Sequence, residues 1–273
     1  MMVFQLLILE LWEKLLLKLI IFGTFVASHC EEKSVATGAI NAGPIAEKLG
    51  VQGVFPEAEE IMAAREIVIA ETNHVHSHIC HISTKTSVNM IRDAKARGVN
   101  VTCETCPHYY SFTQDEVLVS GTNAKMNPPL RTEDDRKAII RGLKDGTIDA
   151  IITDHAPHSE EEKARELSKA PNGIIGFETV LAATITNLIE PGYIDYLDMV
   201  RLTSYSPAKL LGIDKGVIKE NAIADITIFD PNIEYTYEKE SIVSKSKNTP
   251  FIGKKLKGQV VYTIVNGNVV YKK

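Results

Sequence analysis

Cysteine is scarce in this sequence. Four cysteines occur among 273 residues, at positions 30, 80, 103 and 106, and so few thiols exclude a disulfide-stapled scaffold. Cys103 and Cys106 have the C-x-x-C spacing of redox and zinc sites, but no second pair with this spacing follows. We therefore expect both thiols to be buried near the end of a strand, without a redox or zinc-binding role.

An excess of basic residues is also missing. The chain has 30 Lys and Arg against 35 Asp and Glu, which gives a net charge of −5. No stretch combines Arg with aromatic side chains as nucleic-acid-binding surfaces do, so nucleic acid is not expected as a partner. The hydrophobic content of 44% and the charged content of 24% are ordinary for a soluble globular protein.

Long uninterrupted hydrophobic runs do not occur. Residues 1–27 are rich in Leu and Ile, but charged residues between positions 10 and 18 interrupt every run, whereas a membrane-spanning helix needs about 20 apolar residues. A secretory signal would need positive charge ahead of its apolar segment and a small-residue cleavage site, and neither stands out. We expect a buried helix that leads into a strand at 20–28, no contact with a membrane, and a cytoplasmic location.

From about residue 57 the sequence alternates between helical and extended patterns. Helices are predicted at 57–72, 87–97, 132–144 and 176–188, and strands at 76–82, 99–104 and 148–153. Thr132 is a suitable N-cap for the third of these helices. Repeated strand–helix units predict a parallel sheet, and their number favours a TIM-type (β/α)8 barrel over an open sheet.

After about residue 213 the pattern changes to short strands. They are predicted at 216–218, 224–230, 258–265 and 268–271. Asn266 and Gly267 separate the last two, and this dipeptide is a strong signal for a tight hairpin. The sequence thus predicts a barrel domain over 1–212 and a small β-sandwich module over 213–273.

Titratable residues follow the predicted strands. His29, His81, His108 and Asp154 each come just after an extended stretch, and in a barrel of this type such positions converge on the face that carries active sites. Imidazole and carboxylate groups from different strands suit Zn²⁺. We therefore predict an enzyme in which His29, His81 and Asp154 are metal ligands.

Two of these assignments have alternatives. His74, His76 and His78 alternate along one extended face and form an H-x-H pattern that could chelate a metal; we predict instead that His81 is the ligand and that the other three face solvent or neighbouring helices. Asp154 could be a helix cap, but a carboxylate beside a metal can also take a proton from bound water and pass it to a leaving nitrogen.

The segment 127–131, Asn-Pro-Pro-Leu-Arg, is predicted to be a rigid loop. Its prolines fix the backbone and so hold the Asn127 side chain in place. The amide could hydrogen-bond a carbonyl or an N–H of a cyclic amide substrate, although such a segment also serves as an ordinary turn.

Several motifs together resemble the class I dihydroorotases of bacteria. They are Ser-His-Cys-Glu-Glu at 28–32, Cys-His-Ile-Ser-Thr at 80–84, Asn-Ala-Lys-Met-Asn-Pro-Pro-Leu-Arg at 123–131, Thr-Asp-His-Ala-Pro-His at 153–158 and Ala-Pro-Asn-Gly-Ile-Ile-Gly-Phe-Glu-Thr at 170–179. The resemblance runs in this order from about residue 28 to the C-terminus.

The resemblance implies a metal-dependent barrel enzyme with a flanking β-sandwich. The reaction would be the reversible, zinc-dependent cyclisation of N-carbamoyl-L-aspartate to (S)-dihydroorotate in de novo pyrimidine biosynthesis. By motif, His29 and His81 would hold one zinc, and Asp154 would bind the other and act as general acid and base. Asn127, His158 and the backbone at Asn172 and Gly173 would bind the substrate.

Two features of that family are not found in the sequence. The family's early His-x-His-x-Arg segment, which supplies ligands of the first zinc, has no counterpart before His29, and residues 1–27 contain no Asp that could bridge the metals. We expect an incomplete barrel in an N-terminally truncated chain, with impaired activity.

Other functions remain open. One is another cyclic amidohydrolase, of the hydantoinase or allantoinase kind, although these usually carry a metal-bridging carboxylated lysine. Another is a non-catalytic, dihydroorotase-like partner of aspartate transcarbamoylase. Association as a homodimer is a further expectation.

Overall fold

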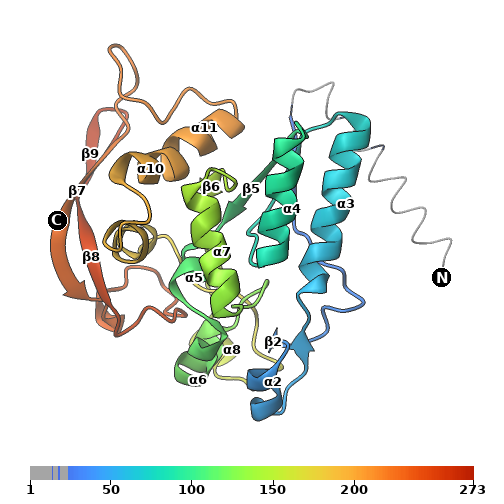
Figure 1. Cartoon of the computed structure of the whole chain (residues 1–273). Coiled ribbons are helices and arrows are strands. Elements are labelled where there is room, and N and C mark those ends of the chain that lie inside the picture. The colour runs from blue at the N-terminus through green and yellow to red at the C-terminus, as the bar shows by residue number, and fades with distance from the viewer. Residues whose placement is uncertain (1–13, 15–17, 19–23) are drawn as a thin grey trace.

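The computed structural model describes Lys14, Lys18 and residues 24–273 (Figure 1). The helix predicted before residue 20, apart from Lys14 and Lys18, and the first four residues of the strand predicted at 20–28 lie outside this part. None of the helices that are described is long and apolar enough to cross a membrane.

A four-stranded parallel sheet forms the centre of the molecule. Its order is β1 (Val26–Ser28), β4 (Ser77–Ile79), β5 (Val101–Thr105) and β6 (Ala150–Ile151). All three pairings are parallel, and this confirms the predicted parallel sheet. The carboxyl ends of these strands therefore point the same way, so that the residues after them meet at one edge.

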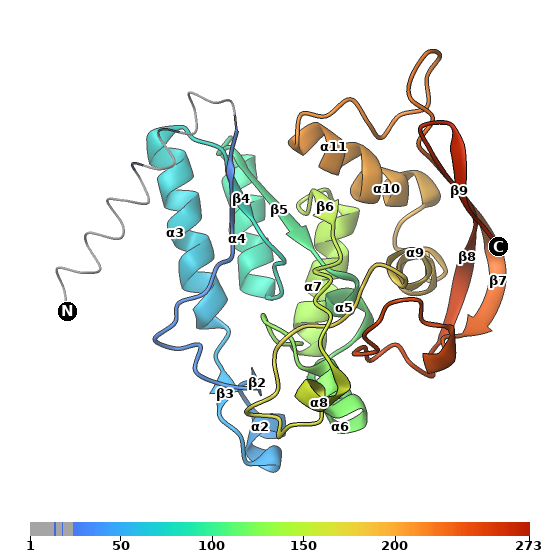
Figure 2. The ribbon, with the colours of Figure 1, turned by 180° about the vertical axis from the view of Figure 1, so that it is seen from behind.

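Three long helices cover one face of this sheet (Figures 1 and 2). They are α3 (Glu57–Asn73), α4 (Lys85–Ala96) and α7 (Glu133–Lys144), each close to its predicted bounds. The core between helices and sheet contains fully buried Ile79, Ile91 and Ile139. Burial of such side chains contributes about 1.5–3 kcal/mol each and fixes the helices on the sheet.

Shorter elements connect and extend this layer. They are β2 (Ile40–Asn41), α2 (Pro44–Leu49), β3 (Gly53–Val54), α5 (Pro107–Ser111), α6 (Val117–Ser120), α8 (Glu160–Lys163), α9 (Val180–Thr184), α10 (Tyr196–Val200) and α11 (Ser206–Leu210), with π-helical turns η3 (Ile185–Ile189) and η4 (Arg201–Tyr205) and the 3-10 turns η1 (Gln114–Glu116), η2 (Gly121–Ala124) and η5 (Lys239–Ser241).

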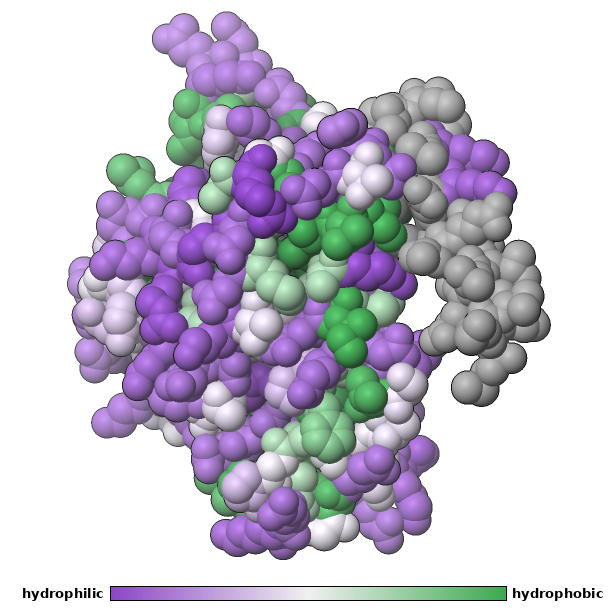
Figure 3. Space-filling model, turned by 45° about the vertical axis from the view of Figure 1, so that its right-hand side comes forward, coloured by the Kyte–Doolittle hydropathy of each residue, from purple (hydrophilic) through white to green (hydrophobic). Residues whose placement is uncertain are grey.

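Helix α3 carries apolar side chains on both its inner and its outer face. Ala63 and Ala70 are buried against the sheet, whereas Ile61 and Val68 are 51% and 60% exposed. Figure 3 brings this side of the molecule forward and shows hydrophobic side chains in a band across it. Helix α3 therefore carries more apolar side chains than its contact with the sheet buries.

The C-terminal segment forms a three-stranded antiparallel sheet, in the order β7 (Ile226–Thr236), β8 (Lys255–Val265) and β9 (Asn268–Lys272). Asn266 and Gly267 turn the chain between the last two strands with φ angles of 50° and 77°, as a type I′ hairpin requires. The predicted small β module and its hairpin are confirmed. Within the described residues the module predicted as a β-sandwich is a single antiparallel sheet, which packs against α9 through Leu256 and Ala182.

Several predicted elements differ from the structure, including the strand predicted at 76–82, which is shortened to β4. Residues 216–218 form no strand. The strand predicted at 148–153 is reduced to β6, and Asp154, just beyond the predicted strand, has a left-handed φ of 45°. The helix predicted from residue 176 begins only at α9. Before it, the backbone N–H groups of Ile175 and Gly176 donate to other loops.

Candidate active site

His29 and His81 meet at the carboxyl edge of the parallel sheet. Ser28 in β1 pairs with Ile79 in β4, so the residues that follow these two strands emerge side by side. His29 Nδ1 and His81 Nε2 lie 2.9 Å apart, with the rings edge to face. The structure thus brings together two histidines that are 52 positions apart in sequence.

The backbone around His81 is held by neighbouring elements. His81 has a left-handed φ of 34°, which costs free energy and persists only where the surroundings impose it. Just after it, Ile82 N–H donates to Glu104 O at 2.9 Å. The Glu59 carboxylate of α3 then accepts from the backbone N–H of Ser83 and of Thr84, at 3.0 and 3.1 Å.

The loop that carries Asn127 is tied to the same segment. Arg131 is 3% exposed; its Nε donates to Ser83 Oγ at 3.1 Å and its Nη1 to Asn41 Oδ1 at 2.7 Å. Four residues earlier, Asn127 Nδ2 donates to Glu31 Oε1 at 2.6 Å and lies 3.5 Å from His29 Nε2. Asn127 therefore faces the histidine pair.

Asp154 lies three residues beyond β6 with a left-handed backbone. The interpretation of this residue as a helix cap is wrong, because the next helix, α8, is capped by Ser159 in a capping box with Glu162. Burial, and next to it His29, lowers the pKa of the His81 imidazole. The negative charge of Asp154 has the opposite, smaller effect and raises this pKa. Asp154 thus shares the electrostatic environment of the pair.

His158, Asn172 and Gly173 also come together. The Nε2 nitrogen of His158 bonds to the Asn172 carbonyl at 2.8 Å. Gly173 has a φ of 115°, and a Cβ atom there would lie 2.5 Å from the Ala156 Cβ, so only glycine fits at this close approach. The structure therefore joins the loop after β6 to the loop before α9.

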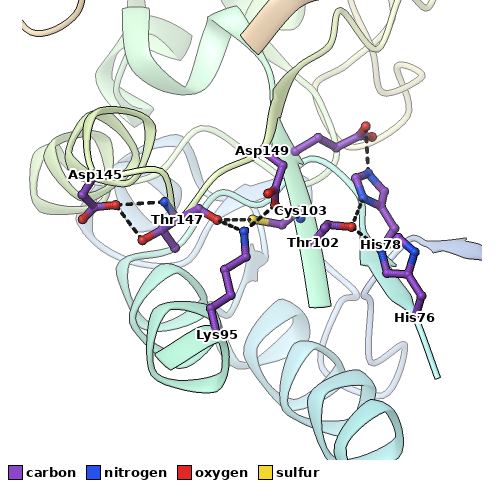
Figure 4. A network of polar contacts seen from close by, with 9 residues as sticks. His76, His78, Lys95, Thr102, Cys103, Asp145, Thr147 and Asp149 are labelled. Carbon is purple, nitrogen blue, oxygen red and sulfur yellow. Dashed lines mark hydrogen bonds and ion pairs between the residues drawn. The ribbon is translucent and has the colours of Figure 1, made fainter. Parts of the chain in front are cut away.

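A polar network covers the face of β4 and β5 opposite the helices. Thr102 Oγ1 lies between His76 Nε2 and His78 Nδ1, at 2.7 and 2.8 Å (Figure 4), and His78 Nε2 contacts Glu104 Oε2 at 3.1 Å. His78 is 3% exposed. The prediction that His78 faces solvent or helices is therefore wrong, because this residue points to the inner face of the sheet and is buried there.

Burial lowers the pKa of two histidines at this edge of the sheet. It lowers the pKa of His81, with His29 as the next cause, and it lowers the pKa of His108 to about 3, with a smaller effect of His81. Within residues 24–273, His81 Nδ1 and His108 Nε2 are buried without a hydrogen-bond partner. Neutral imidazoles keep a lone pair, which is the form that binds a metal.

The thiols carry no comparable chemistry. Cys103 and Cys106 are free and buried, as predicted, and burial raises the pKa of both. Burial, followed by Glu104, raises the pKa of Cys80 to about 12. These groups are protonated thiols at neutral pH and not thiolate nucleophiles.

The pair fits two ligands of a metal ion but not a complete site. Two nitrogens at about 2.05 Å from a tetrahedral zinc lie about 3.3 Å apart, close to the 2.9 Å between His29 Nδ1 and His81 Nε2. No group of three His, Cys, Asp or Glu side chains is arranged to hold a metal within the described residues. Further ligands would have to join the pair.

Sequence-based reasoning missed two contributors to this region. Glu31, which holds Asn127, belongs to the same short motif as His29 and could have been found there. The rings of His155 and Phe177 stack 4.0 Å apart although Phe177 is 67% exposed, and no sequence pattern signals this contact.

A parallel sheet with histidines and an aspartate after its strands is the arrangement of a metal-dependent hydrolase barrel. The model of the amidohydrolase family matches residues 22–270, and the chain belongs to that family.

Two curated relatives, both named dihydroorotase, show the similarity in sequence. The protein of Acetivibrio thermocellus is 50% identical over 252 residues, which are 92% of this chain and 59% of the relative. The protein of Clostridium acetobutylicum is 48% identical over 242 residues, or 89% and 57% of the two chains. The chain thus spans a little under three fifths of the length of such relatives.

Solved structures show the similarity in fold. The L-hydantoinase of Arthrobacter aurescens has a TM-score of 0.82 and 28% identity, over 92% of this chain and 58% of its own. The dihydropyrimidinase of Brevibacillus agri has a TM-score of 0.84 and 26% identity, over 95% and 59%. The described sheet and helices therefore correspond to part of a TIM-type barrel, as predicted.

Proposed function

We propose that this chain is a dihydroorotase, which interconverts N-carbamoyl-L-aspartate and (S)-dihydroorotate in de novo pyrimidine biosynthesis. The observation that carries the proposal is the contact between His29 and His81 at adjacent strand ends, with Asn127 beside them. Identity near 50% to proteins named dihydroorotase supports it. Such an enzyme would act on its small-molecule substrate in the cytoplasm.

In this proposal His29 Nδ1 and His81 Nε2 would hold a zinc ion, and Asp154 would belong to the same metal centre. Bound zinc would polarise the substrate carbonyl and lower the pKa of a water molecule. Neutral imidazoles suit this role because protonated rings cannot bind a cation. The burial that lowers the His81 pKa therefore favours the metal-binding form at neutral pH.

The other residues of the proposed site transfer the proton and bind the substrate. The Asp154 carboxylate takes a proton from the attacking water in hydrolysis and delivers it to the ring nitrogen as the amide bond breaks. The Asn127 amide, which already donates to Glu31, can exchange that contact for a polar atom of the ring. His158 and the backbone at Asn172 and Gly173 bind the substrate from the opposite loop.

Hydrolysis of dihydroorotate by the zinc-loaded chain tests this assignment. We expect slow turnover, which Asp154→Asn reduces by about 10²–10⁴-fold because the proton acceptor is lost. Asp149→Asn is the matched control: this residue precedes β6, at its other end, and pairs with Lys95 at 2.6 Å. Equal losses in both variants, or unchanged turnover in Asp154→Asn, would count against the proposed role.

A second candidate is hydantoinase activity, because solved hydantoinases share the fold at TM-scores of 0.77–0.83. Their identity to this chain, 25–28%, is about half that of the dihydroorotases. Turnover of hydantoin or dihydrouracil in preference to dihydroorotate would favour this second candidate.

A further inference from the structure

Asn248 lies in the segment between η5 and β8, far in sequence from the candidate site, and is 3% exposed. Its side chain reaches the two loops that carry His158 and Gly173. Nδ2 donates to the Ala156 carbonyl at 2.9 Å and to the Gly173 carbonyl at 3.1 Å. The C-terminal segment thus contacts both loops through one amide group.

The amide oxygen and the backbone carbonyl of Asn248 also accept hydrogen bonds from these loops. Oδ1 accepts from the backbone N–H of His158 at 3.2 Å, and the backbone carbonyl of Asn248 accepts from Ile175 N–H at 3.0 Å. Both amide hydrogens and the amide oxygen are therefore used. A side chain that lacked either the two donors or the acceptor would leave buried backbone groups without partners, which is costly.

These contacts fix the position of the loop that carries His158 relative to the loop that carries Gly173. The Gly173 backbone has no side chain to anchor it and has a φ of 115°, so the direction of its carbonyl depends on partners such as Asn248. His158 is held at its backbone by Asn248 and at its ring by Asn172. Removing the Asn248 amide would release both loops at once.

We propose that Asn248 is a positioning residue, which aligns His158, Asn172 and Gly173 for substrate recognition. The inference rests on the proposed function, because these three groups form the substrate-binding side of that site. Asn248 does not itself contact the reacting atoms in this proposal. Its effect should therefore appear in substrate affinity more than in the rate of the bound complex.

Asn248→Asp removes the two donors with almost no change in shape and directs a carboxylate at two carbonyl oxygens. Asn187→Asp is the matched control, because Asn187 Nδ2 also makes two donations, to Ser111 Oγ at 3.1 Å and Ala183 O at 2.9 Å, away from the loops. Binding of dihydroorotate to the zinc-loaded full chain is measured by calorimetry, and backbone hydrogen exchange by mass spectrometry.

For Asn248→Asp we expect about tenfold weaker dihydroorotate binding, a rise in KM with kcat little changed, and faster exchange in segments 154–158 and 172–175. Asn187→Asp should change binding less than about twofold. Asn248→Gln keeps the amide donors and acceptor but places them one methylene further from the backbone. Its affinity for dihydroorotate should lie between those of the wild type and Asn248→Asp.

Equal loss of affinity in Asn248→Asp and Asn187→Asp would overturn the inference, and so would unchanged exchange in both loops. Failure of both Asn248 variants to fold would assign the residue to global stability instead. If the wild-type chain binds no dihydroorotate, the proposed function fails, and loop exchange alone then decides whether Asn248 positions these segments.

Discussion

At the scale of single residues, the backbone is strained where the site is assembled. Two of the five non-glycine residues with a left-handed φ within the described chain are His81 and Asp154. Such conformations cost about 1–3 kcal/mol and persist where the surrounding structure imposes them. The contacts around His81 that supply this constraint come from Glu59 and Glu104.

The carboxylate of Glu59 can be tested against a neighbour on the same helix. Glu59→Gln removes an acceptor for the Ser83 and Thr84 backbone, so we expect zinc affinity to fall about tenfold, as for other residues that orient ligands. Glu66→Gln is the control, because Glu66 is fully buried and accepts from Ser77 Oγ within β4. Equal zinc affinity in both variants would contradict the role of Glu59.

The buried His108 predicts a loss of stability in acid. The unfolded chain binds a proton at this residue below its ordinary pKa of 6.5, whereas the folded protein binds it only near pH 3. The free energy of unfolding should therefore fall below pH 6.5, by about 1.4 kcal/mol per pH unit from this group. Burial lowers the pKa of His76 and His81 as well, and they act in the same direction.

Urea unfolding at neutral pH and at pH about 5.5 measures this dependence. The variant His108→Gln should show a pH dependence that is shallower by about 1.4 kcal/mol per pH unit. Identical slopes for the wild type and the variant would mean that His108 binds its proton equally in the folded and the unfolded chain, which would contradict its lowered pKa.

At the scale of elements, α7 depends on its N-terminal cap. Thr132 Oγ1 accepts from Asp135 N–H, and the Asp135 carboxylate accepts from Thr132 N–H; the same carboxylate accepts from Lys85 N–H at 2.8 Å and so joins α7 to α4. We expect Thr132→Ala to lower the free energy of unfolding by about 1 kcal/mol. Thr132→Ser keeps the hydroxyl and should remain within about 0.5 kcal/mol of the wild type in thermal denaturation.

Elements whose signal is local could be predicted from the sequence. The Thr132 cap, the Asn266–Gly267 hairpin and the three long helices all follow from short-range patterns. The path of the loop before α9 could not be predicted in this way, because the N–H groups of Ile175 and Gly176 bond to Asn248 and His155. These partners are distant in sequence, and no periodicity records them.

The same distinction applies to the candidate site. His29, His81 and Asp154 stood out because each follows a strand. The prediction that His78 faces solvent or helices is wrong because the alternation of three histidines indicates which residues share a face of the strand. It does not indicate which of the two faces is buried. Asn248 had no signal, since one asparagine in an irregular segment matches no motif.

At the scale of the whole molecule, a sheet of four parallel strands aligns residues from four separate segments at one edge. The chain spans about 59% of the length of its curated relative from Acetivibrio thermocellus. Within the described residues, the proposed ligands His29 and His81 meet, but no group of three His, Cys, Asp or Glu side chains is arranged to hold a metal. Zinc binding is therefore the property on which the proposed function most depends.

Titration of the purified chain with Zn²⁺, followed by elemental analysis, tests that property most directly. We predict about one tightly bound zinc per chain, lost in His81→Ala but retained in His76→Ala, whose imidazole bonds to Thr102 and not to His29. Absence of bound zinc in the wild type, or full retention in His81→Ala, would contradict the assignment of His29 and His81 as metal ligands.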